Sequence, residues 1–336
     1  MKQHGRIKLA FCIFGLAGAA LFTLLLIRQG AYEVGAAFAA AKWALAAVVV
    51  YHLVVTTWVD ALAWWLLYPS WDQLPLRSLF WMRWVGESVS TLVPSAGVGG
   101  EIVRARLATL NGASGSVAAA SVLIDITLNL FAMVGYTLLG LILLVGATGQ
   151  NHFIAPTLIG IAIAFGIFAG FYFVQHLGMF GFLARIVARI SDAPEWRSLV
   201  QSSENLDQML RTLYARRLGV VAALGAALVA LIGGSGEIWI GLRVLGLDAT
   251  VVHALILQSL TLAIRSAAFP VPAGLGVQEG GYVFVGNLLG IPGEAAFALS
   301  LIARVREFTV GVPGLIAWQL IETRRLWRAR VSRAAR

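Results

Sequence analysis

The sequence has one cysteine and few charged residues. Cys12 is the only cysteine among 336 residues, so an intrachain disulfide is impossible. Charged residues make up 12% of the chain, about half of the roughly 25% typical of soluble domains. Together with 59% hydrophobic residues and a mean hydropathy of +0.84, this composition excludes a soluble enzyme and a disordered protein. The net charge of +9 does not indicate nucleic-acid binding, because most of the chain cannot lie on a wet surface.

Motifs for metal binding, nucleophilic catalysis and nucleotide binding are also missing. The five histidines do not have the spacing of metal ligands, and His52 and His253 fit hydrogen-bonded core residues. No serine near the two Gly-x-Gly motifs has a histidine close to it in sequence. Neither Gly-x-Gly follows a predicted strand, so neither is a dinucleotide fingerprint. We therefore expect no metal, no cofactor and no enzymatic activity.

Long hydrophobic runs dominate the chain instead. A spanning helix needs about 20 apolar residues, and the runs that reach this length cover residues 7–27, 43–68, 116–145, 153–174, 218–242 and 294–321. Two further hydrophobic stretches, 79–112 and 251–290, are each interrupted by a cluster of proline and glycine. The polar residues 175–217 are long enough for two amphipathic helices. We predict an all-α polytopic membrane protein, one integral membrane domain over residues 1–336, with six full spans and two re-entrant hairpins.

The distribution of Lys and Arg predicts the orientation, because cytoplasmic loops collect positive charge. If both interrupted stretches re-enter, the N-terminus, the connector 175–217 and the basic tail 322–336 all lie on the cytoplasmic side. In that arrangement 18 of the 25 Lys and Arg residues lie inside and four lie within the membrane. The alternative is that each interrupted stretch crosses the membrane once, which puts the basic segments on conflicting sides.

The two interrupted stretches resemble each other. Residues 87–101 read ESVSTLVPSAGVGGE and residues 265–279 read RSAAFPVPAGLGVQE. Each contains Val-Pro, Gly-x-Gly and a glutamate seven residues after the proline, at an offset of 178. These motifs are common enough to arise by chance, but the flanking spans match at nearly the same offset. Because the predicted topology orients the two units oppositely, we predict inverted repeats at 43–146 and 218–321, the usual build of secondary transporters.

Proline and glycine explain the interruptions. Proline lacks a backbone N–H and glycine permits unusual backbone angles, so a helix ends there. The freed backbone groups cannot face lipid, so each turn must line a cavity or be buried in protein. A helix that restarts at such a turn points its N-terminal amides at the cavity and attracts anions such as a lipid phosphate. The backbone breaks that we expect to line the site are Pro94, Gly97, Gly99, Pro272, Gly274 and Gly276.

Ionisable residues in the predicted membrane zone are the candidate functional residues. Each costs about 2.5–3.5 kcal/mol at a helix centre if unpaired, so these residues must pair or face water. Glu87 corresponds to Arg265 at the repeat offset, and Asp125 corresponds to Arg304 at an offset one residue longer. This correspondence predicts a central network of carboxylates and guanidiniums. The network is either structural, or its arginines hold an anionic head group while carboxylates orient the head group or carry protons. The candidate substrate-binding residues are Arg265, Arg304, Glu101, Glu279, Glu87, Asp125, Arg306 and Glu307.

These motifs resemble a known family. The pattern from Val-Pro94 through Gly-Gly-Glu101-x-x-Arg104 to Asp125 is similar to the transmembrane region of lysylphosphatidylglycerol synthases. The second half, with Pro272-x-Gly-x-Gly and later Arg304-Val-Arg306-Glu307, looks closest to the stand-alone branch found with bacterial hopanoid-biosynthesis genes. In the bifunctional relatives this region is regarded as a flippase for aminoacylated phospholipid, and a separate soluble domain makes the lipid. The chain ends soon after the last predicted span, so we expect no synthase activity.

The resemblance implies a flippase-like lipid translocator or lipid-binding transporter of the bacterial inner membrane, with both termini in the cytoplasm. Its substrate would be a polar-headed lipid such as a phospholipid or a hopanoid. The expected partners are membrane lipids, with lipid-biosynthesis enzymes and a second copy of the chain as further candidates, and no nucleic acid. Two alternatives remain. One is a membrane-embedded enzyme that modifies a lipid head group with Glu101 or Glu279 as general base, and the other is an accessory protein in lipid synthesis.

Overall fold

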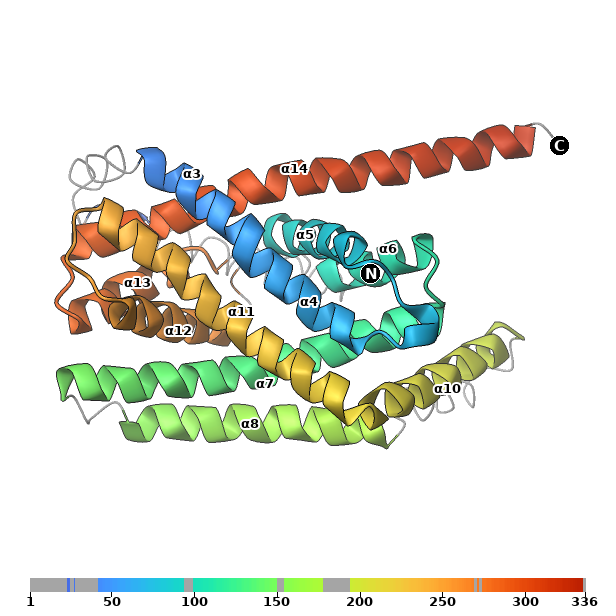
Figure 1. Ribbon diagram of the computed structural model, residues 1–336, viewed down its shortest axis with the longest axis horizontal. Coiled ribbons are helices and arrows are strands. Elements are labelled where there is room, and N and C mark those ends of the chain that lie inside the picture. The colour runs from blue at the N-terminus through green and yellow to red at the C-terminus, as the bar shows by residue number, and fades with distance from the viewer. Residues whose placement is uncertain are drawn as a thin grey trace, which may run out of the picture.

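The computed structural model describes residues 23–24, 27, 42–93, 99–149, 154–177, 194–268, 271 and 274–334. The regular secondary structure of these residues is entirely helical, and they contain no strand (Figure 1). The helices are α3 (Lys42–Tyr51), α4 (Thr57–Leu67), α5 (Leu76–Leu92), α6 (Gly99–Leu110), α7 (Gly115–Thr148), α8 (Ile154–His176), α10 (Pro194–Ala215), α11 (Arg217–Val244), α12 (Val251–Ala267), α13 (Val277–Leu288) and α14 (Gly293–Ala334). A π-helical turn, His52–Thr56, joins α3 to α4, and a 3-10 turn, Ser70–Asp72, precedes α5. The all-α fold class is confirmed.

Among the described residues, four helical segments are long and apolar enough to cross a membrane. They are Ala46–Leu67, Gly115–Thr148, Leu158–Gln175 and Arg217–Val244, and they coincide with four of the predicted spans. Helix α14 has 42 residues, but its predicted span also contains Arg304, Arg306 and Glu307. The predicted span at 7–27 lies almost wholly outside the described residues. The polytopic membrane fold is therefore confirmed, whereas the count of six full spans stays a prediction.

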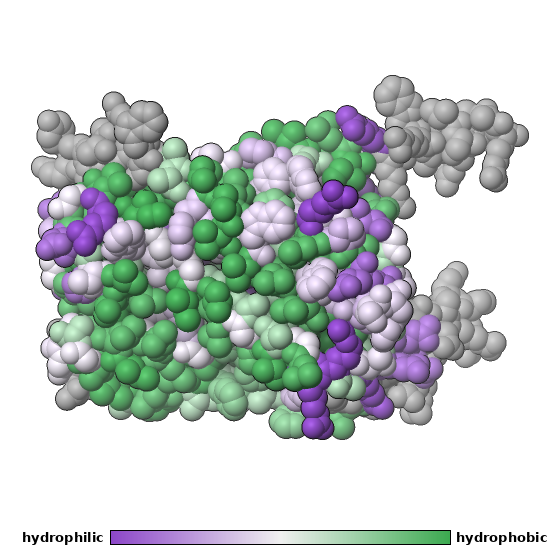
Figure 2. All heavy atoms as spheres, viewed as in Figure 1, coloured by the Kyte–Doolittle hydropathy of each residue, from purple (hydrophilic) through white to green (hydrophobic). Residues whose placement is uncertain are grey.

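The outer surface agrees with a position in the bilayer. In Figure 2 hydrophobic residues cover most of the visible face, and hydrophilic residues gather towards its ends. On α8, the side chains of Ile159, Phe165 and Ile167 are each more than half exposed. An apolar surface that covers most of one face is unfavourable in water and favourable against lipid tails.

Each interrupted stretch forms two helices that lie side by side. Helices α5 and α6 pack against each other, as do α12 and α13. Their lengths match, since α5 and α12 each have 17 residues and α6 and α13 each have 12. In Figure 1 the chain enters and leaves the α5–α6 hairpin at the right end, and enters and leaves the α12–α13 hairpin at the left end. The two hairpins therefore re-enter from opposite ends of the molecule.

The two predicted repeats, residues 43–146 and 218–321, are called the first and the second half. Each half packs one helix of its hairpin along a long helix of the other half. Helix α5 of the first half packs along α14, α12 of the second half packs along α7, and α4 packs on α11. Small residues allow the close crossings, with Gly314 of α14 against Ser88 of α5 and Gly140 of α7 against Ser259 of α12. This shared order of elements supports the predicted inverted repeat, whose boundaries stay a prediction.

The predicted connector and tail are also helical where they are described. Helix α10 packs on α7 and buries Tyr214, whose hydroxyl donates to Oε1 of Gln175 at 3.1 Å. The amide of Gln175 in turn donates to the hydroxyl of Thr127 on α7 at 3.0 Å. The first of the two amphipathic helices predicted for the connector falls mainly on residues outside the described ranges. The predicted tail continues α14 as far as Ala334.

The crossing of α5 and α6 provides a stability test. A Cβ atom at Gly100 would overlap the Gly86 carbonyl oxygen and the Ser90 hydroxyl of α5. Gly100→Ala is therefore expected to lower the free energy of unfolding by about 1–3 kcal/mol, the usual cost of overpacking. The measurement is the thermal unfolding midpoint in detergent. The matched control is Gly225→Ala inside α11, which meets no atom within 4 Å and is expected to be neutral or slightly stabilising. Equal midpoints for Gly100→Ala and the wild type would contradict the close crossing.

Candidate functional site

In the part of the chain that the structure describes, charged side chains and one glutamine that lie between the helices form three clusters. The α7 cluster contains Asp60, Arg83, Glu101, Arg104 and Asp125. The α14 cluster contains Arg265, Gln278, Glu279, Arg304 and Glu307. The inter-half cluster contains His52, Glu87, Glu237 and Arg306.

The α7 cluster ties the first hairpin to α7 through one carboxylate. Oδ2 of Asp125 accepts from Nη1 of Arg83 on α5 at 2.5 Å and from Nη2 of Arg104 on α6 at 2.7 Å. Nη1 of Arg104 donates to Glu101 at 2.6 Å, and its guanidinium lies 4.3 Å from the centroid of the Trp64 ring. Each cation therefore has a carboxylate, as burial requires.

The α14 cluster ties the second hairpin to α14 with the charges reversed. Nε of Arg304 donates to Oε1 of Glu279 on α13 at 2.7 Å, and its Nη2 donates to the Gly274 carbonyl at 3.1 Å. Oε2 of Glu279 accepts from the Gly276 amide at 2.7 Å, so this carboxylate occupies the positive N-terminal end of α13. Glu307 binds Nη1 of Arg265 on α12 at 2.6 Å.

Asp125 and Arg304, which correspond in the two repeats, each bind a hairpin of their own half and do not form an ion pair with each other. Asp125 on α7 binds arginines of its own hairpin, and Arg304 on α14 binds a glutamate of its own hairpin. The ion pairs of Glu87 go to His52 and Arg306, whereas Arg265 pairs with Glu307. Over the described ranges, the central network predicted from the sequence is thus divided into three clusters, and of these the inter-half cluster is the one with residues from both halves.

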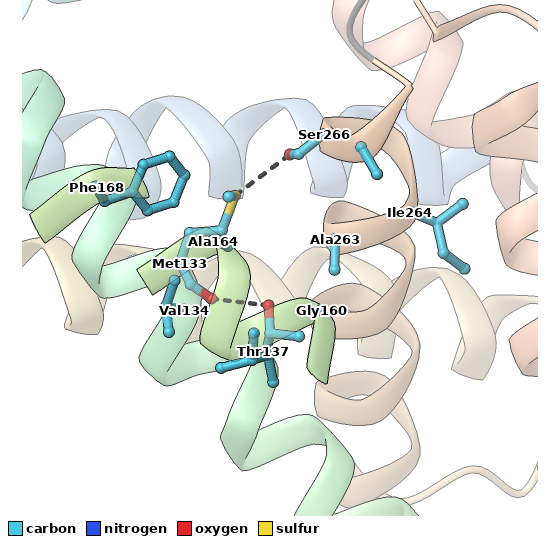
Figure 3. A pocket seen from close by; sticks show the side chains of 11 residues that line it. Met133, Val134, Thr137, Gly160, Ala164, Phe168, Ala263, Ile264 and Ser266 are labelled. Carbon is cyan, nitrogen blue, oxygen red and sulfur yellow. Dashed lines mark hydrogen bonds between the residues drawn. The ribbon is translucent and has the colours of Figure 1, made fainter. Parts of the chain in front are cut away.

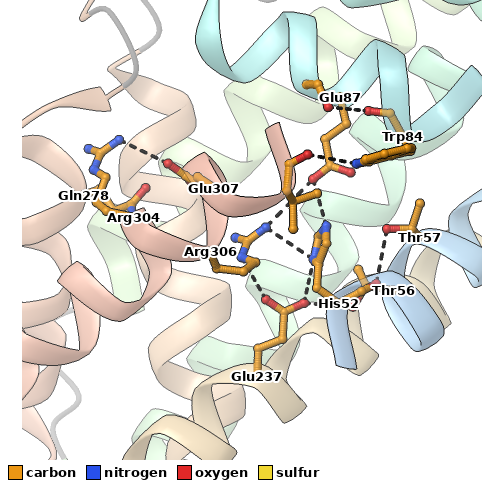
Figure 4. A network of polar contacts seen from close by, with 12 residues as sticks. His52, Thr56, Thr57, Trp84, Glu87, Glu237, Gln278, Arg304, Arg306 and Glu307 are labelled. Atoms are coloured by element: carbon orange, nitrogen blue, oxygen red, sulfur yellow. Dashed lines mark hydrogen bonds and ion pairs between the residues drawn. The ribbon is translucent and has the colours of Figure 1, made fainter. Parts of the chain in front are cut away.

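The inter-half cluster surrounds His52 (Figure 4). Nδ1 of the imidazole lies 2.8 Å from Oε1 of Glu237 on α11, and Nε2 lies 3.1 Å from Oε1 of Glu87 on α5. Arg306 of α14 places Nε 3.2 Å from Oε2 of Glu237 and Nη1 3.8 Å from Glu87. The hydroxyl of Thr56, in the same π turn as His52, donates to Glu237 at 2.9 Å. Four helical elements from both halves therefore meet at one ring.

Exposure separates the candidate residues into two groups. The side chains of Glu279 and Asp125 are 0% and 3% exposed, and both oxygens of Glu279 and Oδ2 of Asp125 accept hydrogen bonds from protein groups. The side chains of Glu87, Arg265 and Glu101 are 33%, 31% and 26% exposed. Only the second group can meet a ligand without first breaking a buried ion pair.

The backbone breaks are partly described. Gly274 and Gly276 have φ values of +59° and +76°, a region that glycine enters at little cost. A Cβ at Gly274 would lie 3.0 Å from Cγ of Arg265, so glycine also lets this arginine approach the turn. Gly99 begins α6. The other predicted breaks, Pro94, Gly97 and Pro272, lie outside the described residues.

Arg104 and His52 are two of the cluster residues that were not among the candidate site residues predicted from the sequence. The predicted orientation places Arg104 among the 18 cytoplasmic Lys and Arg residues, but the structure buries it against Trp64 and Asp125. Arg104 follows Glu101 by three residues, a spacing that places both on one helix face and was the available signal. His52 was interpreted as a hydrogen-bonded core residue, and no sequence pattern indicated its two carboxylate neighbours.

An apolar pocket lies beside the second hairpin (Figure 3). It has a volume of about 390 Å³ and lies between α7, α8 and α12. Phe168 of α8, Val134 of α7 and Ile264 of α12 contribute apolar walls. Ser266 also lines the pocket and donates to the Met133 sulfur at 3.3 Å. A second, smaller space of about 40 Å³ is lined by polar groups that include Arg265, Gln278 and Glu307.

One of the comparisons with known proteins identifies a family. The family described as "Lysylphosphatidylglycerol synthase TM region" matches residues 12–314 of the chain. Searches of curated proteins and of solved structures gave no match. Within the described residues, no group of three or more His, Cys, Asp or Glu side chains is arranged to hold a metal ion.

Proposed function

Because the chain belongs to the lysylphosphatidylglycerol synthase transmembrane-region family, we propose that it moves a polar-headed lipid between the leaflets of the membrane. The substrate class is a phospholipid or a hopanoid, and the protein acts as a transporter, not an enzyme. It resides in the bacterial inner membrane with both termini in the cytoplasm. The observation that carries the proposal is a partly exposed arginine of a re-entrant hairpin, placed between a polar space and an apolar pocket.

Arg265 is the residue best placed for the lipid head group. Both of its hydrogen bonds to described residues use Nη1, one to Glu307 and one to Gln278, each at 2.6 Å. A guanidinium carries five N–H donors, so Nε and Nη2 remain to receive an anionic group such as a phosphate. Because Gly274 carries no side chain, the side chain of Arg265 can pack against the turn.

The pocket between α7, α8 and α12 suits the lipid tail. Ligand pockets are typically about 300–1,000 Å³, and this pocket of about 390 Å³ is lined mainly by apolar side chains. Ile264 and Ser266, the sequence neighbours of Arg265, both line it. A lipid could therefore keep its tail in the pocket while its head group reaches the polar space on the other side of α12.

Movement of one half against the other would expose the head-group site to each leaflet in turn. Inverted repeats with broken helices commonly work by such rocking. This movement would shift the crossings of α5 with α14 and of α7 with α12, where a glycine of one half packs against a serine of the other. The clusters within each half would hold each hairpin rigid, while the inter-half cluster would change.

Filling the pocket tests the site of the tail. Gly160 of α8 lines the pocket and meets no atom within 4 Å, so Gly160→Leu would fill the space without strain. The expected result is a several-fold lower rate of lipid transfer in proteoliposomes, because the new side chain competes with the tail. Gly166→Leu is the matched control, since it lies on the same helix with open space around it and outside the pocket lining. Equal rates for the two variants would rule out this pocket as the tail site.

A leaflet-resolved lipid profile of the native host tests the function itself. A strain without the gene is expected to accumulate the substrate lipid in one leaflet while its total amount stays constant. Expression of the wild-type chain should restore the distribution. A missing or chemically altered lipid species in the deletion strain would instead favour the membrane-embedded enzyme or the accessory role, and would contradict transport.

A further inference from the structure

We propose that His52 is a proton-carrying site that couples lipid movement to a proton gradient. The proposal deepens the proposed function by naming its energy source, and it rests on that function. It starts from the inter-half cluster, where one imidazole contacts residues from both halves of the molecule.

Nδ1 is at hydrogen-bond distance from Glu237 and Nε2 is at ion-pair distance from Glu87, and two carboxylates beside one ring favour its doubly protonated form. Nδ1 lies 2.8 Å from Glu237 and Nε2 lies 3.1 Å from Glu87, and carboxylates only accept hydrogen bonds. The charged groups that face the ring are Glu87 from α5, Glu237 from α11 and Arg306 from α14. With His52 protonated, two cations balance two carboxylates, and the buried cluster is neutral.

The neutral ring also has partners, so the proton can leave. When Nε2 loses its proton, Nδ1 keeps its hydrogen and can donate it to Oε1 of Glu237, which lies 2.8 Å away. In the release step the Nε2–H bond breaks, its electron pair stays on the ring, and Oε1 of Glu87 takes the proton. Glu87 then passes the proton to water, and uptake reverses these steps.

Burial gives this transfer a direction. The side chains of His52 and Glu237 are 5% and 8% exposed, whereas that of Glu87 is 33% exposed. Glu87 is therefore the group of the cluster that can exchange a proton with water. Glu87 and His52 lie in the same half, so movement of one half against the other would separate both of them from Glu237 and Arg306.

The local backbone supports a functional role for His52. The π-helical turn spans His52–Thr56, and both of these end residues contact Glu237. A π-helix is rare, occurs mostly as a single turn inside an α-helix, and is frequently found at functional sites. Because the cluster joins the two halves, rocking must remake its contacts. If His52 binds its proton more tightly in one conformation of the two halves, protonation shifts the conformational equilibrium towards that conformation.

The experiment uses the full chain in proteoliposomes that contain a head-labelled phospholipid and are given an imposed pH gradient. If one proton moves with each lipid, a gradient of one pH unit shifts the wild-type leaflet ratio about tenfold at steady state. His52→Gln is expected to abolish this shift while lipid still exchanges between the leaflets without a gradient. His253→Gln, in the exposed N-terminal cap of α12, is the matched control and should keep the full shift.

The possible failures are distinguishable. If the wild type transfers no lipid under any condition, the proposed function fails. If the wild type transfers lipid at a leaflet ratio that ignores the gradient, transport stands and the proton proposal is overturned. A gradient response retained in His52→Gln also overturns it. If His52→Gln does not fold, proton uptake by the wild type is followed with a pH-sensitive dye during lipid transfer. Proton uptake supports coupling, and the absence of uptake refutes it.

Discussion

Asp125→Ala is expected to lower the free energy of unfolding by about 3–5 kcal/mol, the usual cost of removing one partner from a buried ion pair. Asp125 accepts from both Arg83 and Arg104, and its loss leaves Arg104, which is 2% exposed, with only the partly exposed Glu101. The hairpin would then lose its attachment to α7. The measurement is the unfolding midpoint in detergent, together with the monodisperse fraction after purification.

Two further variants sharpen this prediction. Asp125→Asn keeps the size and one acceptor oxygen, so it should lose less stability than Asp125→Ala. Asp248→Ala removes a fully exposed carboxylate paired with Arg243 and should leave the midpoint unchanged, as expected for surface pairs. An Asp125→Ala protein as stable as Asp248→Ala would show that the α7 cluster does not hold the hairpin.

Arg265→Ala is expected to reduce lipid transfer by about tenfold or more with a fold that remains intact. Hydrogen bonds to charged groups are worth about 1.5–3 kcal/mol, and 1.4 kcal/mol is a factor of 10. Arg265 is partly exposed, so the variant should retain its stability better than a variant of a buried cation. The measurement is the transfer rate of an anionic phospholipid in proteoliposomes. The matched control, Arg243→Ala at the end of α11, removes an exposed arginine outside the clusters and should transfer lipid normally.

Arg304→Ala separates the head-group role from a structural one. Arg304 is largely buried and holds Glu279 and the Gly274 carbonyl, so its loss is expected to lower stability more than Arg265→Ala does. Arg265→Lys keeps the charge but loses the planar set of donors and should recover only part of the rate. Full transfer by a well-folded Arg265→Ala protein would remove the head-group role from this residue.

The architecture was predictable because hydrophobic length and backbone chemistry act locally. Four predicted spans match the long apolar helices, since a run of about 20 apolar residues leaves few alternatives to a spanning helix. The hairpins followed from proline and glycine clusters and from the sidedness of Lys and Arg. The internal similarity of residues 87–101 and 265–279 anticipated the matched lengths of α5 with α12 and of α6 with α13.

The pairing of charges was not predictable, because it depends on how each helix is rotated about its axis. Helix α6 contains Glu101, Arg104 and Arg106, a composition typical of a solvated surface helix. Packing against α7 nevertheless buries Arg104. The π turn at His52 shifts the register of its helix by one residue, and no residue type in that segment indicates such a turn. Repeat offsets identified equivalent positions, but contacts form within each half as well as between halves.

Transbilayer movement of a labelled anionic phospholipid in proteoliposomes of the purified chain tests the central claim most directly. A membrane-impermeant quencher reports how much labelled lipid reaches the outer leaflet. We expect transfer well above that of protein-free vesicles, with loss of transfer in Arg265→Ala and normal transfer in Arg243→Ala. Transfer no faster than in protein-free vesicles, with folded protein and intact vesicles, would contradict a lipid translocator.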